Sequence, residues 1–132
     1  IPPNQREGVD VVFSHNDFQE NNVMVENNDK SKMILIDFEF SMLNFRGFDL
    51  GALFNESYID YIVKSRPAFK FHEELFDFLL QRNEIDHIAR HYLKHYHGKF
   101  YQGEKTSEQF LEEELPILKD QITRAVLLEH LL

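Results

Sequence analysis

The fold of this chain is decided by two short stretches, HNDFQENN at residues 15–22 and ILIDFE at residues 34–39. Both stretches place acidic or amide side chains beside runs of β-forming residues. These runs cover residues 11–13, 23–25 and 33–36. The polar segment 27–30 between the last two runs is typical of a tight turn. The pattern therefore predicts a β-hairpin that brings Asp37 back beside Asn22.

The polar residues of the two stretches have the spacing of a phosphoryl-transfer site. Asp17 follows an apolar run and is expected on a loop, where a carboxylate can accept the proton of an attacking hydroxyl. Asn22, five positions later, and Asp37, after the next strand, can hold the Mg²⁺ that bridges nucleotide phosphates. Glu39 would share a strand face with Asp37 if the strand continues, and could add an outer or second-metal contact. An isolated His-Asn-Asp is usually an ordinary polar loop, but the paired spacing with flanking strands favours the site.

The composition limits the kinds of partner. The chain has 132 residues, of which 42% are hydrophobic and 14% aromatic, which suits one folded unit with a core. With 23 acidic and 14 basic residues the formal charge is −9, which argues against nucleic acid or an anionic membrane surface and tolerates a cationic substrate. There is no cysteine, and no apolar stretch approaches the ~20 residues of a bilayer span, so membrane insertion is not expected. A cytoplasmic location is expected. The start at Ile1 and the end at Leu132 suggest a piece of a larger protein.

From about Leu50 the apolar spacing becomes helical, which predicts a helical bundle for the second half. Breaks are expected at residues 65–67 and 98–103. Thr106 and Gln109 could form a capping box at the start of the last helical region.

Further expectations concern side chains in the second half. Pro116 should start, kink or split the last helical region. The segment 112–114 is three glutamates and is most simply a solvated acidic turn. Four phenylalanines are expected to pack the bundle, namely Phe69, Phe71, Phe76 and Phe78.

Three histidines recur at every fourth residue, His87, His91 and His95, a spacing that can chelate Zn²⁺ or Ni²⁺. A solvated face is favoured, because the apolar stripe of the same helix is carried by Tyr92 and its neighbours.

Taken together, the two stretches resemble the choline/ethanolamine kinase family, which is related to aminoglycoside phosphotransferases and more distantly to protein kinases. The resemblance covers about residues 11–61. It rests on VFSHND at 12–17, followed by Gln19, Glu20 and Asn22, and on LIDFEF at 35–40, followed by NFRGFDLG at 44–51.

The resemblance implies an α+β fold, the central part of the C-terminal lobe of a protein-kinase-like fold. Residues 1–49 would hold the catalytic loop and a short metal-binding β-hairpin, and residues 50–132 a mostly α-helical part. The amino-terminal lobe and the final tryptophan-bearing helices would lie outside residues 1–132. The chain alone is therefore expected to be inactive.

The resemblance also implies a role for each site residue. Asp17 would be the catalytic base, Asn22 and Asp37 would bind Mg²⁺, and Glu39 would lie in the metal shell. Further residues of the site are Gln19, lining the cleft, Glu56 and Tyr61, receiving the substrate's ammonium group, and His15, Arg46 and Asp49, supporting the site. Independently of the resemblance, loop Arg and Asp residues commonly hydrogen-bond to the backbone of neighbouring loops, so Asp49 would brace the catalytic loop. Without the resemblance, Glu56 and Tyr61 could equally be an exposed acid and a half-buried aromatic on an ordinary helix.

The function implied is ATP- and Mg²⁺-dependent phosphorylation of choline to phosphocholine, the first step of phosphatidylcholine synthesis. Gln19-Glu20 and RGFD at residues 46–49 look more like the choline branch of the family. Ethanolamine and an aminoglycoside remain open as acceptors. A non-catalytic, kinase-like scaffold is the alternative from a different class. A homodimer is expected only by analogy with the family.

Overall fold

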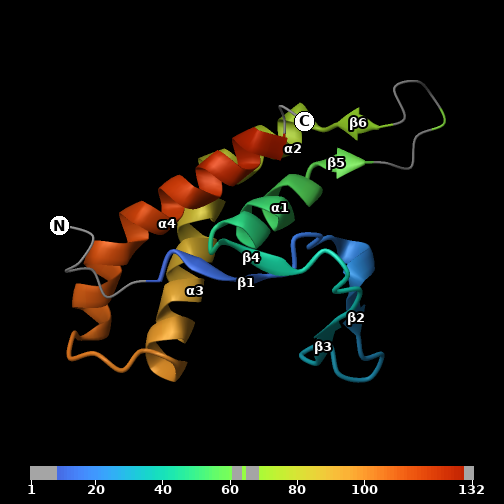
Figure 1. The fold of residues 1–132 in the computed structure, drawn as a ribbon. Coiled ribbons are helices and arrows are strands. Elements are labelled where there is room, and N and C mark those ends of the chain that lie inside the picture. Colours follow the sequence, from blue (N-terminus) through green and yellow to red (C-terminus); the bar gives the residue numbers. More distant parts are fainter. Residues whose placement is uncertain (1–8, 61–63, 65–68, 130–132) are drawn as a thin grey trace.

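The structure, a computed structural model, describes residues 9–60, 64 and 69–129 (Figure 1). The described part contains helices and short antiparallel strand pairs. In chain order the elements are β1 (Val11–Ser14), the 3-10 helix η2 (Glu20–Asn22), β2 (Val23–Val25), β3 (Met33–Leu35), β4 (Met42–Phe45), α1 (Phe48–Glu56), β5 (Ile59–Asp60), β6 (Lys70–Phe71), α2 (Glu73–Gln81), α3 (Glu84–Lys99) and α4 (Ser107–Glu129). None of the described helices combines the length and the apolar character that crossing a membrane requires.

The predicted hairpin is confirmed. β2 pairs with β3 in antiparallel register, with Val23 opposite Leu35, and the hairpin projects away from the helices (Figure 1). Its turn is closed by the Lys32 N–H, which donates to the Asp29 carbonyl over 3.0 Å. Hydrogen bonds from Ser31 hold the pKa of the Asp29 carboxyl below its ordinary value.

Two further strand pairs were not predicted. β1 pairs with β4, with Phe13 opposite Leu43, and β5 pairs with β6 over only two residues on each strand. Such short strands carry too few residues to show a period of two in the sequence.

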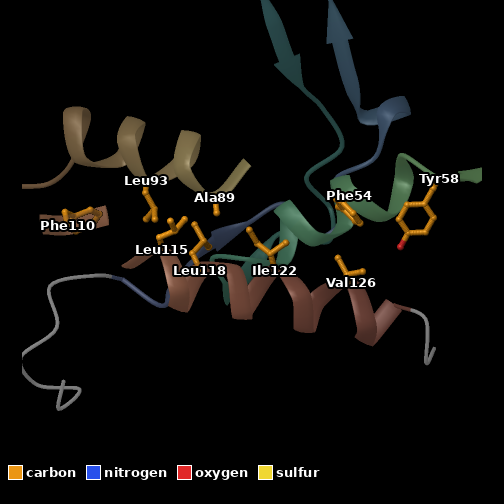
Figure 2. Packing of buried hydrophobic residues seen from close by; sticks show 9 residues of the cluster. All are labelled: Phe54, Tyr58, Ala89, Leu93, Phe110, Leu115, Leu118, Ile122 and Val126. Atoms are coloured by element: carbon orange, nitrogen blue, oxygen red, sulfur yellow. The ribbon is translucent and has the colours of Figure 1, made fainter. Parts of the chain in front are cut away.

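The helical bundle is confirmed, and α4 is its central element. α1 and α3 both pack on α4, and Figure 2 shows Leu93 of α3 directed at Leu115 and Leu118 of α4. The buried core cluster comprises Phe54, Tyr58, Ala89, Leu93, Phe110, Leu115, Leu118, Ile122 and Val126. Polar contacts add to the packing, since Lys119 of α4 lies 2.8 Å from Asp86 of α3. Hydrogen bonds from Lys119 and then Arg90 lower the pKa of Asp86.

Two glycines let α1 approach α4 closely. A Cβ built on Gly51 would lie 2.5 Å from the Cβ of Ala125, and one built on Gly47 would lie 2.7 Å from the Cβ of Gln121. Ordinary carbon contacts need more than 3.4 Å, so no larger side chain fits without moving a helix. The start of α1 is thereby set directly against the backbone of α4.

The ends of the long helices agree with the sequence in part. Thr106 and Gln109 form the predicted capping box, with the Gln109 N–H donating to Thr106 Oγ1 over 3.3 Å and the Thr106 N–H to Gln109 Oε1 over 3.0 Å. α3 ends at Lys99, inside the break predicted at 98–103. The break predicted at 65–67 lies outside the described residues.

α4 neither starts nor divides at Pro116 but continues through it, and the nearby Leu115 and Leu118 are buried in the core. Their packing sustains the helix despite the backbone N–H that a proline lacks.

Of two predictions about side chains in the second half, one is confirmed in part and the other is wrong. Phe71 and Phe76 pack against the core, but Phe69 and Phe78 are 51% and 48% exposed. Phe78 follows Phe76 by two positions on α2, and residues two apart do not share a helix face. The three glutamates at 112–114 are not a solvated turn, because they lie within α4 and Glu114 is fully buried.

Candidate active site

The expected catalytic loop lies between β1 and η2 and is held by a carboxylate from α1. Asp49 lies in the first turn of α1. Its Oδ2 accepts the His15 N–H over 2.7 Å, and its Oδ1 accepts the Asn16 N–H over 2.9 Å. Asn16 has φ 64°, a left-handed conformation that Asn tolerates better than most residues. Both oxygens of Asp49 therefore hold the backbone directly before Asp17.

The strand before the loop contributes little packing to it. Val11 and Phe13 of β1 are 50% and 67% exposed, whereas Ser14 and His15 are buried. The anchor is the Asp49 carboxylate, which lies 34 positions from His15 in the chain. Contacts of this range leave no periodic signal in the sequence.

Asp17 is half-buried and lies among amide groups. Its carboxylate accepts from Gln19 Nε2 over 3.1 Å and from Asn22 Nδ2 over 2.8 Å. Asn22 Nδ2 also donates to the Asp17 carbonyl over 2.9 Å. Since the amide nitrogen of Asn22 is engaged with Asp17, its oxygen Oδ1 is the atom left for a cation. The structure thus brings Asp17, Gln19 and Asn22 together.

The segment that carries Asp37 is tied to the same loop. The Ile36 N–H donates to the Asn22 carbonyl over 3.0 Å. Asp37 directly follows Ile36, so the hairpin brings Asp37 close to Asn22 in space. Asp37 is exposed and has φ 65°. His15 bridges the two segments, with Nε2 2.8 Å from the Ile36 carbonyl and its ring centroid 4.8 Å from that of Phe38. A carbonyl oxygen only accepts hydrogen bonds, so Nε2 is the ring nitrogen that carries the hydrogen in this contact.

The strand does not continue to Glu39, as the suggested metal contact assumed. β3 ends at Leu35, and the Ser41 N–H donates to the Phe38 carbonyl over 3.0 Å, which closes a turn. The left-handed Asp37 breaks the two-residue alternation that would have put Glu39 on its face. Glu39 is exposed in this turn.

Two asparagines that the sequence analysis did not single out connect the turn to the catalytic loop. Asn16 Nδ2 donates to the Phe40 carbonyl over 2.9 Å, and Asn44 Nδ2 donates to Asn16 Oδ1 over 2.7 Å. Both residues lie inside the two motifs that resemble the family, and this position was the one indication in the sequence that they belong to the site.

Arg46 is buried and reaches across to α4. Its Nη2 donates to Glu114 Oε2 over 2.5 Å, and its Nε to Gln121 Oε1 over 3.3 Å. Arg46 lies three residues before Asp49 and so joins the loop anchor to the helical core. Glu114 is a third residue that was not predicted to support the site, because three consecutive glutamates are typical of a solvated segment.

The expected cation site is described only in part. Glu56 is half-buried at the last position of α1, and Tyr61 lies outside the described residues.

The described residues contain no group of three or more His, Asp or Glu side chains arranged to hold a metal ion. The side chains of His87, His91 and His95 are all exposed, in agreement with the solvated face favoured from the sequence. For Mg²⁺ the residues that could serve as donors are Asn22, through its amide oxygen, and Asp37, through its carboxylate. That set suits an ion that takes its other ligands from water and nucleotide phosphates.

A catalytic-type loop, a hairpin that returns an Asp to it, and a helical bundle beneath them define the C-terminal lobe of a kinase-like fold. Comparisons with known proteins agree. The family model for choline/ethanolamine kinase matches residues 5–132. The chain therefore belongs to the choline/ethanolamine kinase family.

Individual relatives show how much of a family member the chain represents. It is 35% identical to choline kinase alpha of Mus musculus over 126 residues, which covers 92% of this chain and 26% of the relative. It is 34% identical to a choline/ethanolamine kinase of Homo sapiens, covering 91% of this chain and 29% of the relative. The crystal structure of a choline kinase from Cryptosporidium parvum Iowa II matches with a TM-score of 0.60 and 27% identity, over 91% of this chain and 30% of that one. The chain thus spans less than a third of the length of each of these relatives.

Proposed function

We propose that this chain is the catalytic-loop portion of a kinase that transfers a phosphoryl group from ATP to the hydroxyl of choline. The observation that carries the proposal is the Asp17 carboxylate, held by Gln19 and Asn22 on a loop that Asp49 anchors. The membership of the family supports the same reaction. The proposal extends to a longer parent protein, in which an amino-terminal lobe and later helices complete the nucleotide and ammonium sites, so that residues 1–132 alone are inactive.

Asp17 is the group that receives the proton. Its half-buried carboxylate is oriented by two amide N–H groups, and the choline hydroxyl would donate to it before attack. The hydroxyl oxygen then bonds to the γ-phosphorus as the bond from that phosphorus to the β-γ bridging oxygen breaks, and the proton passes to Asp17. ADP and phosphocholine leave. Because the loop is anchored at both amides before Asp17, the carboxylate needs little reorganisation during the reaction.

Asn22 and Asp37 would hold Mg²⁺, through Asn22 Oδ1 and the Asp37 carboxylate. When bound, the ion supplies positive charge that offsets the charge developing on the phosphates. Glu39 is proposed only as an outer contact, since it lies in the turn beyond Asp37.

Choline is the preferred acceptor and ethanolamine is the second candidate. The preference for choline follows the resemblance of Gln19-Glu20 and residues 46–49 to the choline branch. The human relative is a choline/ethanolamine kinase, which favours keeping ethanolamine. Glu56 and Tyr61 are proposed to receive the ammonium group, where a carboxylate and an aromatic face stabilise a cation. The protein is proposed to act in the cytoplasm.

The test is a coupled ADP-release assay on the full-length protein that carries this chain, with choline, ethanolamine or an aminoglycoside, with and without Mg²⁺. Asp17→Asn should lower kcat by about 100-fold or more, because a positioned base contributes about 10²- to 10⁴-fold. Asp120→Asn is the matched control, since Asp120 is an exposed residue of α4 that pairs only with its neighbour Arg124 among the described residues. Turnover of ethanolamine alone would correct the acceptor. No turnover with any acceptor would favour the non-catalytic scaffold.

A further inference from the structure

We propose that Glu114 of α4 is a positioning residue for the transfer site, acting through Arg46 and Asp49 on the loop before Asp17. The inference rests on the proposed function and concerns a residue far from the reacting atoms. It gives α4 a role beyond core packing.

The first step is a buried ion pair. The side chains of Arg46 and Glu114 are 2% and 1% exposed, and Arg46 Nη2 lies 2.5 Å from Glu114 Oε2. A charged hydrogen bond of this kind is directional, and its guanidinium is planar, so it fixes the orientation as well as the position of Arg46. Glu112, two residues earlier, is exposed, and Glu113 pairs with Lys105 nearer the surface.

The second step is a set of bonds around Arg46 that ties the residue before β1 and the residue after β4 to α4. Gln121 Oε1 accepts the Arg46 Nε–H over 3.3 Å, while Gln121 Nε2 donates to Asp10 Oδ1 over 2.8 Å. The Arg46 backbone N–H donates to the Asp10 carbonyl over 2.9 Å. One arginine therefore joins the residue before β1, the end of β4 and two positions on α4.

The third step runs from Arg46 to the catalytic loop. Gly47 follows at the cap of α1, where a Cβ would lie 2.8 Å from the backbone nitrogen of Ile122, so the helix start rests on α4. Asp49 is in the first turn of that helix and holds the amides of His15 and Asn16. A shift or rotation at Arg46 is therefore passed to the backbone next to Asp17.

A stabilising role alone does not explain the pair. Replacing a buried ion pair by apolar residues of similar volume is often neutral or stabilising, so packing could be achieved without charge. What apolar residues cannot supply is the directional bond that fixes the start of α1. Two measurements test this role: the kinetics of variants, and the amide hydrogen exchange of the loop.

The kinetic arm uses the full-length protein with Glu114→Gln, and Glu112→Gln as the matched control. Glu114→Gln should lower kcat by about 10- to 100-fold with little change in KM for acceptor or ATP, because misplacement of a catalytic group by about 1 Å can cost about 10² in rate. The double variant Arg46→Met with Glu114→Leu should keep the thermal midpoint near that of the wild type and still show the low kcat. Wild-type kcat in the folded double variant, or in folded Glu114→Gln, would overturn the proposal.

The second arm is amide hydrogen exchange, which does not require turnover. In Glu114→Gln the amides of His15 and Asn16 should exchange at least tenfold faster, while core amides at Leu93 and Leu118 keep their protection. Equal loss of protection everywhere, or none at the loop, would show a role in stability only. If the wild type has no activity, the proposed function fails, yet this arm still decides whether Glu114 holds the loop.

Discussion

The close approach of α1 to α4 yields a prediction in which two helical glycines behave in opposite ways. Gly51→Ala places a methyl group 2.5 Å from the Cβ of Ala125 and 3.1 Å from the carbonyl oxygen of Ile122. Gly98→Ala, in the last turn of α3, meets no other atom within 4 Å. Both substitutions have the same chemistry, so Gly98 is the matched control.

The expected magnitudes follow from two opposing terms. Ala in place of Gly stabilises a helix by up to about 1 kcal/mol, which applies to both variants. Overpacking of a close contact costs about 1–3 kcal/mol and applies to Gly51 alone. Gly98→Ala should therefore raise the free energy of unfolding by up to about 1 kcal/mol, and Gly51→Ala should lower it by up to about 2 kcal/mol.

The assay is urea unfolding of the full-length variants, followed by steady-state kinetics below the transition. Because Gly51 lies two residues after Asp49, Gly51→Ala should also lower kcat, whereas Gly98→Ala should leave it unchanged. Adding Ala125→Gly removes the closest atom and should recover part of the loss, a coupling that a double-mutant cycle measures. If Gly51→Ala were as stable as Gly98→Ala, the close packing of α1 on α4 would be refuted.

Three further outcomes are expected. Asp49→Asn leaves one acceptor oxygen for two loop amides and should lower kcat about tenfold, since a hydrogen bond to a charged group contributes about 1.5–3 kcal/mol. An unchanged kcat would mean that the loop does not need this anchor. Asp86→Asn should cost about 1 kcal/mol of unfolding free energy at pH 7. The hydrogen bond from Lys119 lowers the pKa of Asp86 in the folded protein. The stabilisation from Asp86 is therefore present above the ordinary carboxyl pKa of about 4 and is lost as the pH falls through the lowered folded value. The difference in urea midpoint between variant and wild type should be smaller at about pH 3 than at pH 7, and an equal difference at both would contradict this. Thr106→Ala should cost about 1 kcal/mol through the lost cap, measured by thermal unfolding against the exposed Thr123→Ala, and equal midpoints would contradict it.

The hairpin, the capping box and the helical second half could be predicted because each depends on neighbouring residues. The turn at 27–30 and the runs on either side determine the pairing of β2 with β3. Thr106 and Gln109 are three positions apart, and their side chains satisfy each other's backbone amides. Such local rules operate before any tertiary contact forms.

The parts that could not be predicted depend on contacts far apart in the chain. Arg46 and Glu114 are separated by 68 positions. Asp49 was expected to brace the loop, but the sequence does not show which amides, 33 and 34 positions away, it holds. Glu114 lies four positions after Phe110 and four before Leu118, so helical spacing places it on the buried face of α4 and Glu112 off that face. What the spacing does not reveal is the partner, Arg46, because that contact forms only in the folded chain. The same applies to Glu39, whose displacement from the strand face follows from the left-handed backbone of Asp37.

The most direct measurement of the central claim is phosphorus NMR of the full-length protein with ATP, Mg²⁺ and choline, beside Asp17→Asn. We expect a phosphocholine resonance to grow with the wild type and to be almost absent with the variant over the same time. Equal growth of that resonance with both proteins would contradict Asp17 as the base. Its absence with the wild type, with no product from ethanolamine either, would contradict the proposed kinase.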